Sequence, residues 1–326
     1  MKKLIAMLLT LAMVLSLAAC GAQSTPTQAA TEAPAAAETK APAATEASAA
    51  KEIKVGIAAP DVTHGWVAGV AYYAEKYCKE NNLDYMITTS KDAASMTTAL
   101  DDLVAWGATV IVSWPQWTGM ETALQNIIDS GIPVVTIDCV FENCGSVLSD
   151  NVGGMTELVK YAYSMGHRKI AFAYGEDTPV TRRRISGFCR ACKELGLSLP
   201  DEYLVQSMYL DPESSAAATR KLMELPDPPT CILYPDDIAH LGGKNELEKM
   251  GLSVPDDVSI VGYDGIDFCQ TLRPKLTTMR QDAERMGELA AEELARAVEE
   301  GRSYIPGRHV VGGTLLPGET VKKLTP

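Results

Sequence analysis

From Ile53 onward, the chain alternates short apolar, β-branched runs with segments of helical periodicity, and this alternation constrains its fold more than any other feature. In the first helical segment, Trp66, Val70, Tyr73 and Tyr77 recur on one face. The predicted strands span residues 53–58, 85–88, 109–113, 133–137, 169–173, 230–234, 259–262 and 276–279. Strands that are apolar nearly throughout, joined by helices, indicate parallel sheets covered on both faces.

The alternation falls into two runs of similar length. It pauses over the polar stretch 141–154 and begins again at His167, which is predicted to be structural. Two such runs predict an α/β fold with two doubly wound, Rossmann-like lobes. A helix from about residue 282 to 299 comes late, and periodicity does not say which lobe it packs on.

The first 51 residues differ from the rest. Two lysines and an apolar run from Leu4 to about Leu17 are typical of a secretory signal. The run ends Leu-Ala-Ala-Cys, which resembles a bacterial lipobox with Cys20 as the lipidated residue. A transmembrane anchor is the alternative, but the run is shorter than the roughly 20 residues that span a bilayer. We therefore expect a signal peptide over 1–19 and a lipid-anchored protein on the extracytoplasmic face of the cell membrane.

Residues 20–51 contain almost only Ala, Thr, Pro, Glu, Ser and Gln after the lipidated Cys20. Such a segment has no large apolar side chain to bury and cannot offset its chain entropy, so it is predicted to be a disordered linker. The net charge of −13 argues against a nucleic-acid partner.

The cysteines and histidines suggest no metal or catalytic site. Cys189 and Cys192 lie in a helical pattern and are predicted to pack, whereas a disulfide between Cys139 and Cys144 stays open. No glycine-rich phosphate loop, nucleophile motif or paired histidine motif occurs. The sequence therefore predicts a protein that is not an enzyme and that uses no cofactor or metal.

Polar and aromatic side chains follow the predicted strands, at the sheet edge where parallel α/β folds bind ligands. The candidates are His64, Trp66, Trp114, Asp138, Arg182, Asp236, Asp264 and Gln281. Carboxylates accept hydrogen bonds from paired hydroxyls, a guanidinium donates to oxygens, and an indole covers the C–H face of a sugar. The set predicts a neutral, hydroxyl-rich ligand. We assign Asp237 to a helix N-cap, Trp106 to the core and Arg183 to a solvated helix face.

Across residues 53–317 the chain resembles ribose-type periplasmic sugar-binding proteins and the ligand-binding core of lactose- and galactose-repressor-like regulators. The segments that resemble this family are Gly-His-Arg-Lys-Ile-Ala (166–171), Arg-Ile-Ser-Gly-Phe (184–188), Val-Pro-Asp-Asp-Val-Ser-Ile-Val-Gly-Tyr-Asp (254–264) and Leu-Thr-Thr-Met-Arg-Gln-Asp (276–282). The resemblance implies two lobes joined by a three-strand hinge, with ligand in the cleft. It implies a first lobe of 52–150 plus 282–309 and a second of 151–281 plus 310–322.

Because a signal peptide stands where a repressor would have a helix-turn-helix, the resemblance implies the substrate-binding lipoprotein of an ABC importer. Its partners would be a monosaccharide or polyol, the ABC permease and, through the lipid, the membrane. The alternative is a receptor that serves a chemoreceptor or sensor kinase.

The resemblance also implies roles for individual residues. Asp138 and Asp264 would grip hydroxyls from the two lobes, Arg182 would be the ligand arginine, Gln281 the hinge glutamine and Trp66 the aromatic on the ring. The chain departs from the family pattern at four positions: His64 and Trp114, where asparagine is common, Asp236, which replaces an asparagine, and Cys139, where ribose binders place a second arginine. These departures leave open a polyol, a deoxy sugar or an amine-bearing ligand.

Overall fold

The structure, a computed structural model, describes residues 53–301 and 307–325. The predicted signal peptide, Cys20 and the linker lie outside these residues. The first of two sheets is parallel throughout and has the strand order β11-β5-β4-β3-β1-β2. Its strands are β1 (Lys54–Pro60), β2 (Asp84–Ser90), β3 (Val110–Ser113), β4 (Val134–Ile137), β5 (Gly145–Ser149) and β11 (Arg308–Val311).

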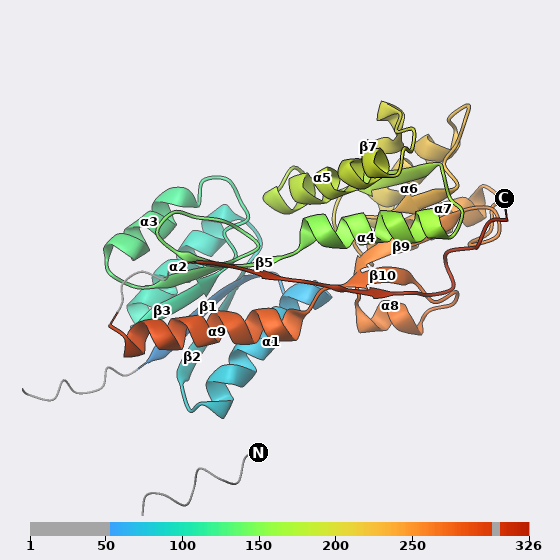
Figure 1. Ribbon diagram of the computed structural model, residues 1–326. Coiled ribbons are helices and arrows are strands. Elements are labelled where there is room, and N and C mark those ends of the chain that lie inside the picture. Colours follow the sequence, from blue (N-terminus) through green and yellow to red (C-terminus); the bar gives the residue numbers. More distant parts are fainter. Residues whose placement is uncertain (1–52, 302–306, 326) are drawn as a thin grey trace, which may run out of the picture. The chain divides into compact units, whose positions relative to one another are not determined.

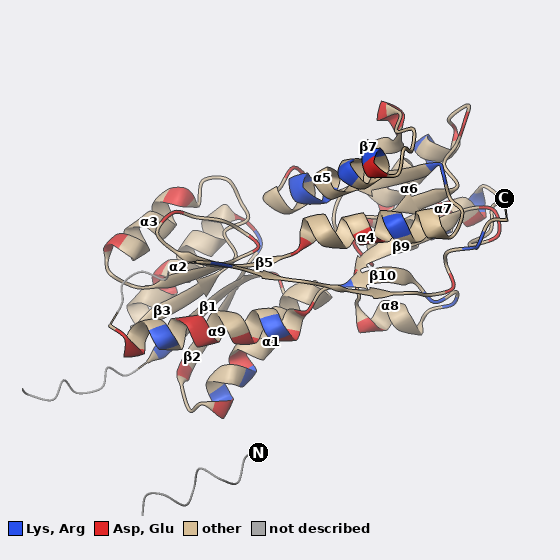
Figure 2. Cartoon of the chain, in the orientation of Figure 1, with Lys and Arg blue, Asp and Glu red and all other residues tan. Residues whose placement is uncertain are grey.

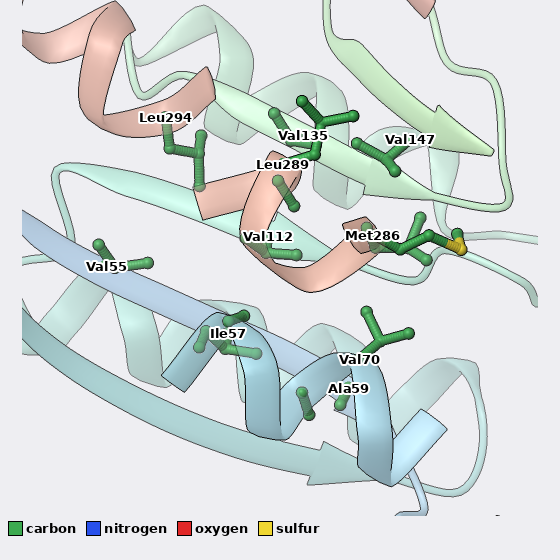
Figure 3. Close-up of a cluster of buried hydrophobic side chains, with 14 of the residues drawn as sticks. Val55, Ile57, Ala59, Val70, Val112, Val135, Val147, Met286, Leu289 and Leu294 are labelled. Atoms are coloured by element: carbon green, nitrogen blue, oxygen red, sulfur yellow. The ribbon is translucent and has the colours of Figure 1, made fainter. Parts of the chain in front are cut away.

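Helices cover both faces of this first sheet because side chains alternate along each strand. Val55, Ile57 and Ala59 of β1 pack with α1 (Gly65–Glu80) and α9 (Ala283–Glu299). Figure 3 shows this cluster, with Val70 from α1 and Met286, Leu289 and Leu294 from α9. Ala58, between those residues, packs in the opposite cluster with α2 (Ala93–Trp106) and α3 (Glu121–Asp129).

The second sheet has the order β12-β10-β9-β8-β6-β7 and is parallel except for its antiparallel edge strand β12. Its strands are β6 (Ile170–Tyr174), β7 (Leu204–Gln206), β8 (Cys231–Leu233), β9 (Ser259–Asp264), β10 (Thr277–Arg280) and β12 (Thr314–Leu316). One face packs on α4 (Asn151–Ser164) and α5 (Pro179–Glu194), the other on α6 (Pro212–Met223) and α7 (Ala239–Lys249). A 3₁₀ turn, η1 (Asp201–Tyr203), precedes β7, and α8 (Asp267–Thr271) follows β9.

The chain passes between the two sheets three times, from β5 to α4, from β10 to α9 and from β11 to β12 (Figure 1). Each sheet with its helices is called a lobe below. The expected fold class, two α/β lobes with mainly parallel sheets, is confirmed. The late helix α9 packs on the first sheet. The residue limits of the lobes stay a prediction.

Every predicted strand occurs within two residues of its expected limits. Four strands were missed, and β5 lies inside the stretch interpreted as a polar pause. Their short, polar or glycine-containing sequences give no apolar run: β5 reads Gly-Ser-Val-Leu-Ser and β12 only Thr-Leu-Leu. These strands form by pairing with a neighbour, which local periodicity does not report.

Charged residues gather on the helices, whereas the strands of both sheets are mostly uncharged (Figure 2). This distribution agrees with sheets buried on both faces. Among the described residues, no helix combines the length and the apolar character needed to cross a bilayer.

Candidate functional site

A cavity of about 530 Å³ lies at the carboxyl ends of the strands and takes its lining from both lobes. The first lobe contributes His64 and Trp66 after β1, Trp114 after β3 and Asp138 after β4. The second lobe and the crossing segments contribute Arg184, Tyr209, Asp264 and Gln281, among others. Six of the eight predicted ligand residues therefore line one cavity, while Arg182 and Asp236 do not.

Asp264 contacts three other side chains that line the cavity. Its Oδ1 accepts a hydrogen bond of 2.6 Å from Gln281 Nε2 and lies 3.5 Å from an Nη atom of Arg184. Its Oδ2 lies 3.1 Å from His64 Nε2, which belongs to the other lobe. The carboxylate thus links a residue of each lobe with the glutamine on the segment between them.

Arg184 occupies the position that we predicted for Arg182. Its side chain is buried, Nε donates to Asn151 Oδ1 at 2.7 Å, and an Nη atom donates to the Pro235 carbonyl at 2.6 Å. Its guanidinium carbon lies 3.6 Å from the centre of the Tyr263 ring. Arg182 is more than half exposed and pairs with Asp177 outside the cavity.

The helical period explains this correction. Thr181, Arg184 and Phe188 lie on the buried face of α5, three and four residues apart, whereas Arg182 points away from that face. That spacing was visible in the sequence and was the signal that could have identified Arg184.

His64 caps the first helix while contacting Asp264. Its Nδ1 accepts a hydrogen bond of 3.2 Å from the Trp66 backbone N–H, which satisfies a free donor at the start of α1. A neutral ring with Nδ1 as acceptor carries its proton on Nε2, the atom that faces Asp264. Burial opposes the charged ring, but the hydrogen bond and charge of Asp264 outweigh it and raise the pKa of His64.

Asp138 is a buried carboxylate that the first lobe contributes to the cavity lining. Its Oδ1 accepts from the Ser149 backbone N–H at 2.6 Å, and its Oδ2 from Ser149 Oγ at 3.2 Å. Burial raises its pKa although these hydrogen bonds act in the opposite direction. Arg183, predicted to be solvated, is only partly exposed and donates to the Asp138 main-chain carbonyl at 3.3 Å, which joins the two lobes.

The predictions for Asp236 and Asp237 are also corrected. Asp236 does not line the cavity and accepts hydrogen bonds from the backbone N–H groups of Ile238 and Ala239 at the start of α7, and from that of Leu210. It therefore does the capping that we assigned to Asp237. The Asp237 carboxylate instead accepts from Ile266 N–H and Thr278 Oγ1 and so joins β10 to the loop after β9. Trp106 packs, partly buried, on the core.

Three lining side chains leave a buried polar atom without a hydrogen-bond partner: Trp66 Nε1, Trp114 Nε1 and Gln281 Oε1. Buried polar groups are nearly always paired in folded proteins. The protein thus keeps two donors and one acceptor unused beside this cavity. Tyr209, Trp117 and Glu176 also line the cavity and were not predicted.

In the described part of the chain, no group of three metal-ligating side chains could hold a metal ion. The cysteines there, including Cys139 and Cys144, are free thiols. Burial raises the pKa of Cys139, a lining residue, to about 12, so its thiol stays protonated and uncharged. The arrangement offers hydrogen bonds, one guanidinium and aromatic surface, which suits binding of a small polar molecule.

The comparisons with known proteins agree with this architecture. The family model described as "Periplasmic binding protein-like domain" matches residues 159–321, which is half of the chain. Over 180 residues the chain is 32% identical to the "Probable HTH-type transcriptional repressor ExuR" of Bacillus subtilis, with 54% of each protein covered. The chain thus spans about half the length of this curated relative.

Two solved structures have the same fold. A LacI-type transcriptional regulator from Bacillus cereus has a TM-score of 0.75 at 25% identity, covering 84% of this chain and 100% of that one. A LacI family transcriptional regulator from Enterococcus faecium, solved with bound ribose, has a TM-score of 0.73 at 22% identity and covers 83% and 100%. Both of these proteins are named as transcriptional regulators.

The comparisons overturn several predictions. Because the relatives are transcriptional repressors and regulators, the assignment to an ABC importer or a membrane sensor is wrong, as are the ABC permease as partner and the extracytoplasmic lipoprotein location. The exclusion of nucleic acid is also overturned, since net charge sums the whole chain whereas DNA binding depends on a local basic surface. The resemblance was correct for the fold, but one fold serves several functions.

Proposed function

Because the chain belongs to the family of the periplasmic binding protein-like domain, we propose that residues 53–325 form the effector-binding module of a transcriptional regulator. The module binds a small, hydroxyl-rich molecule of the sugar or polyol class between its lobes. The single observation that supports this most directly is the cavity in which both lobes place buried hydrogen-bonding side chains, above all Asp138 and Asp264.

The mechanism follows from the distribution of these side chains over two lobes. A ligand makes its full set of hydrogen bonds only when both lobes surround it, so it shifts the equilibrium between open and closed forms by its differential contact energy. The contacts His64–Asp264 and Arg183–Asp138 carbonyl already join the lobes across the cavity. Closure would bring both sets of ligand contacts within reach together.

The relatives support the regulatory part of the proposal. One is named a transcriptional repressor and two solved neighbours are named transcriptional regulators, one of them with bound ribose. We therefore propose that ligand state in this module controls a transcriptional response through DNA.

Calorimetry against a panel of pentoses, hexoses and polyols tests ligand binding. We expect at least one compound to bind with micromolar affinity or tighter, about −8 kcal/mol, and to raise the melting temperature by mass action. The Asp138→Asn variant should weaken that binding, whereas Asp177→Asn, which changes an exposed acid outside the cavity, should not. Failure of every compound to produce heat or a thermal shift would overturn the proposal.

A second experiment tests the regulatory role. Fragments of the source genome are incubated with the full chain at a fixed salt concentration, and bound fragments are recovered and sequenced. Enrichment of particular sequences that changes when the bound sugar is added supports the proposal. No enrichment over fragments of shuffled sequence would contradict it and leave ligand binding as a separate property.

A further inference from the structure

The cavity is surrounded by more buried negative than positive groups. Four carboxylates around it are at least 95% buried, whereas Arg184 is the one buried guanidinium among the described residues. The four are Asp138, Asp236, Asp237 and Asp264. Even a protonated His64 would leave two cations against four carboxylates. Burying a charge is costly unless it is paired or hydrogen-bonded.

Two of these carboxylates, Asp236 and Asp237, do not line the cavity, and a third, Asp264, lines it but is already paired. Asp264 has Arg184, His64 and Gln281 around it. Asp236 accepts hydrogen bonds from three backbone N–H groups, and Asp237 from Ile266 N–H and Thr278 Oγ1. None of these three therefore offers the cavity a carboxylate that lacks an ion pair.

Asp138 differs from them because it lines the cavity and its carboxylate, which accepts two hydrogen bonds from Ser149, forms no ion pair within 4 Å among the described residues. The charges of Arg184 and Arg183 lower the pKa of Asp138 in part, but Arg184 pairs with Asp264 and Arg183 donates its hydrogen bond to the Asp138 main-chain carbonyl. The next residue, Cys139, also lines the cavity, and its protonated thiol supplies no positive charge. Asp138 is therefore a buried carboxylate in the cavity lining without a paired cation.

The lining of the cavity as a whole also carries more acidic than basic side chains. The acidic and basic side chains of the whole lining, apart from His64, are Asp61, Lys91, Asp138, Glu176, Arg184 and Asp264. Four acids thus face two bases. A cavity of this balance repels anions such as sugar phosphates or sugar acids and attracts cations.

The uncharged side chains of the lining indicate which other groups the ligand carries. Three indoles, Trp66, Trp114 and Trp117, line the cavity, and aromatic rings attract cations as well as sugar C–H faces. The unpaired indole N–H groups of Trp66 and Trp114 require an acceptor, and the unpaired Gln281 Oε1 requires a donor. A molecule with hydroxyl groups and an N–H donor can supply both.

We propose that the ligand is an amine-bearing sugar or polyol, whose ammonium group pairs with Asp138 while its hydroxyl groups bind Asp264, Arg184 and Gln281. This inference rests on the proposed ligand-binding function and narrows its ligand class. The ammonium supplies the cation that Asp138 lacks, and the hydroxyl oxygens supply acceptors for the indole donors.

Matched compounds test the inference by calorimetry on the full chain. Each set contains a neutral sugar, its 2-amino sugar, the N-acetylated amine and the corresponding uronic acid, for glucose, galactose and mannose. We expect one amino sugar to bind at least about tenfold more tightly than its neutral parent, since charge-assisted hydrogen bonds are the stronger kind. The N-acetylated compound should lose this advantage, and the advantage should shrink as salt is added.

Variants assign the effect to Asp138. Asp138→Asn keeps an oxygen to accept from Ser149 and should bring the amino sugar and its parent to equal affinity, while Asp177→Asn should preserve the tenfold difference. If a neutral sugar or uronic acid binds more tightly than the amine in every set that binds, the amine inference is overturned and the proposed function stands. If no compound of any set binds, both are overturned. If Asp138→Asn keeps the preference, Asp138 is not the group that seats the amine.

Discussion

Asp138 and Asp264 occupy equivalent positions in the two lobes: Asp138 follows β4 and Asp264 ends β9, and both strands are third from the same edge of sheets with the same order. Both residues have a positive φ, +52° for Asp138 and +107° for Asp264, which is unfavourable for a residue with a Cβ atom. Such strain persists where surrounding structure enforces it, commonly at binding sites. Each lobe thus places one carboxylate at the end of an equivalent strand, on a residue with a positive φ.

The pair of arginines on α5 gives a direct test of the site. Arg184→Met should lower the free energy of unfolding by about 3 kcal/mol, because it leaves Asp264 and Asn151 buried without their cationic partner. Arg182→Met should change it by less than about 0.5 kcal/mol, because the Arg182–Asp177 pair is exposed. Urea unfolding of both variants measures the difference. Equal effects would contradict the assignment of Arg184.

Two substitutions separate the roles of His64. His64→Asn retains an oxygen that can cap α1 but loses the contact between Nε2 and Asp264, whereas His64→Ala loses both. We expect the alanine variant to be about 1 kcal/mol less stable to unfolding than the asparagine variant, the usual value of a helix N-cap. Thermal or urea denaturation measures this. Identical stabilities would show that His64 does not cap the helix.

His240 predicts a pH dependence of stability. Burial lowers its pKa from 6.5 to about 4, so between these values the unfolded chain binds a proton that the folded chain does not. The free energy of unfolding should therefore fall as pH falls from about 6.5 to 4, by about 3 kcal/mol from this group. Below that range both states are protonated, and the loss stops.

Unfolding curves collected between pH 7 and 4 check this expectation. His240→Gln, which can still donate to the Asp237 carbonyl, should remove that part of the pH dependence. His309→Gln, at a more exposed histidine beside Glu293, serves as the control. A slope in His240→Gln as steep as in the unchanged chain would refute the prediction.

A glycine between two helices of the second lobe should be intolerant of a side chain. A Cβ atom at Gly242 of α7 would lie 1.9 Å from the main-chain oxygen of Pro212 in α6, so Gly242→Ala should cost about 2 kcal/mol or more. At Gly312 a Cβ atom would have no neighbour within 4 Å, and Gly312→Ala should be close to neutral. Comparable losses in melting temperature for both would contradict the close approach of α6 and α7.

The strands that were predicted differ in sequence from the four that were missed. Strands buried on both faces, such as β1 and β9, can be predicted from their mostly apolar sequences. The strands β7, β11 and β12 lie at sheet edges, and β5 is short and rich in small residues, so their strand conformation depends on partners far away in the chain. Local periodicity carries no information about those partners.

The sequence by itself determined the two α/β lobes and the sheet edge at which polar residues gather, because hydrophobic periodicity and strand-end chemistry are local properties. It did not distinguish Arg184 from Arg182, or the roles of Asp236 and Asp237, because neighbouring residues differ only in the direction their side chains take. Only the tertiary structure decided which carboxylates found a partner. Among the described residues Asp138 forms no ion pair, because pairing depends on groups that the fold brings together from distant segments.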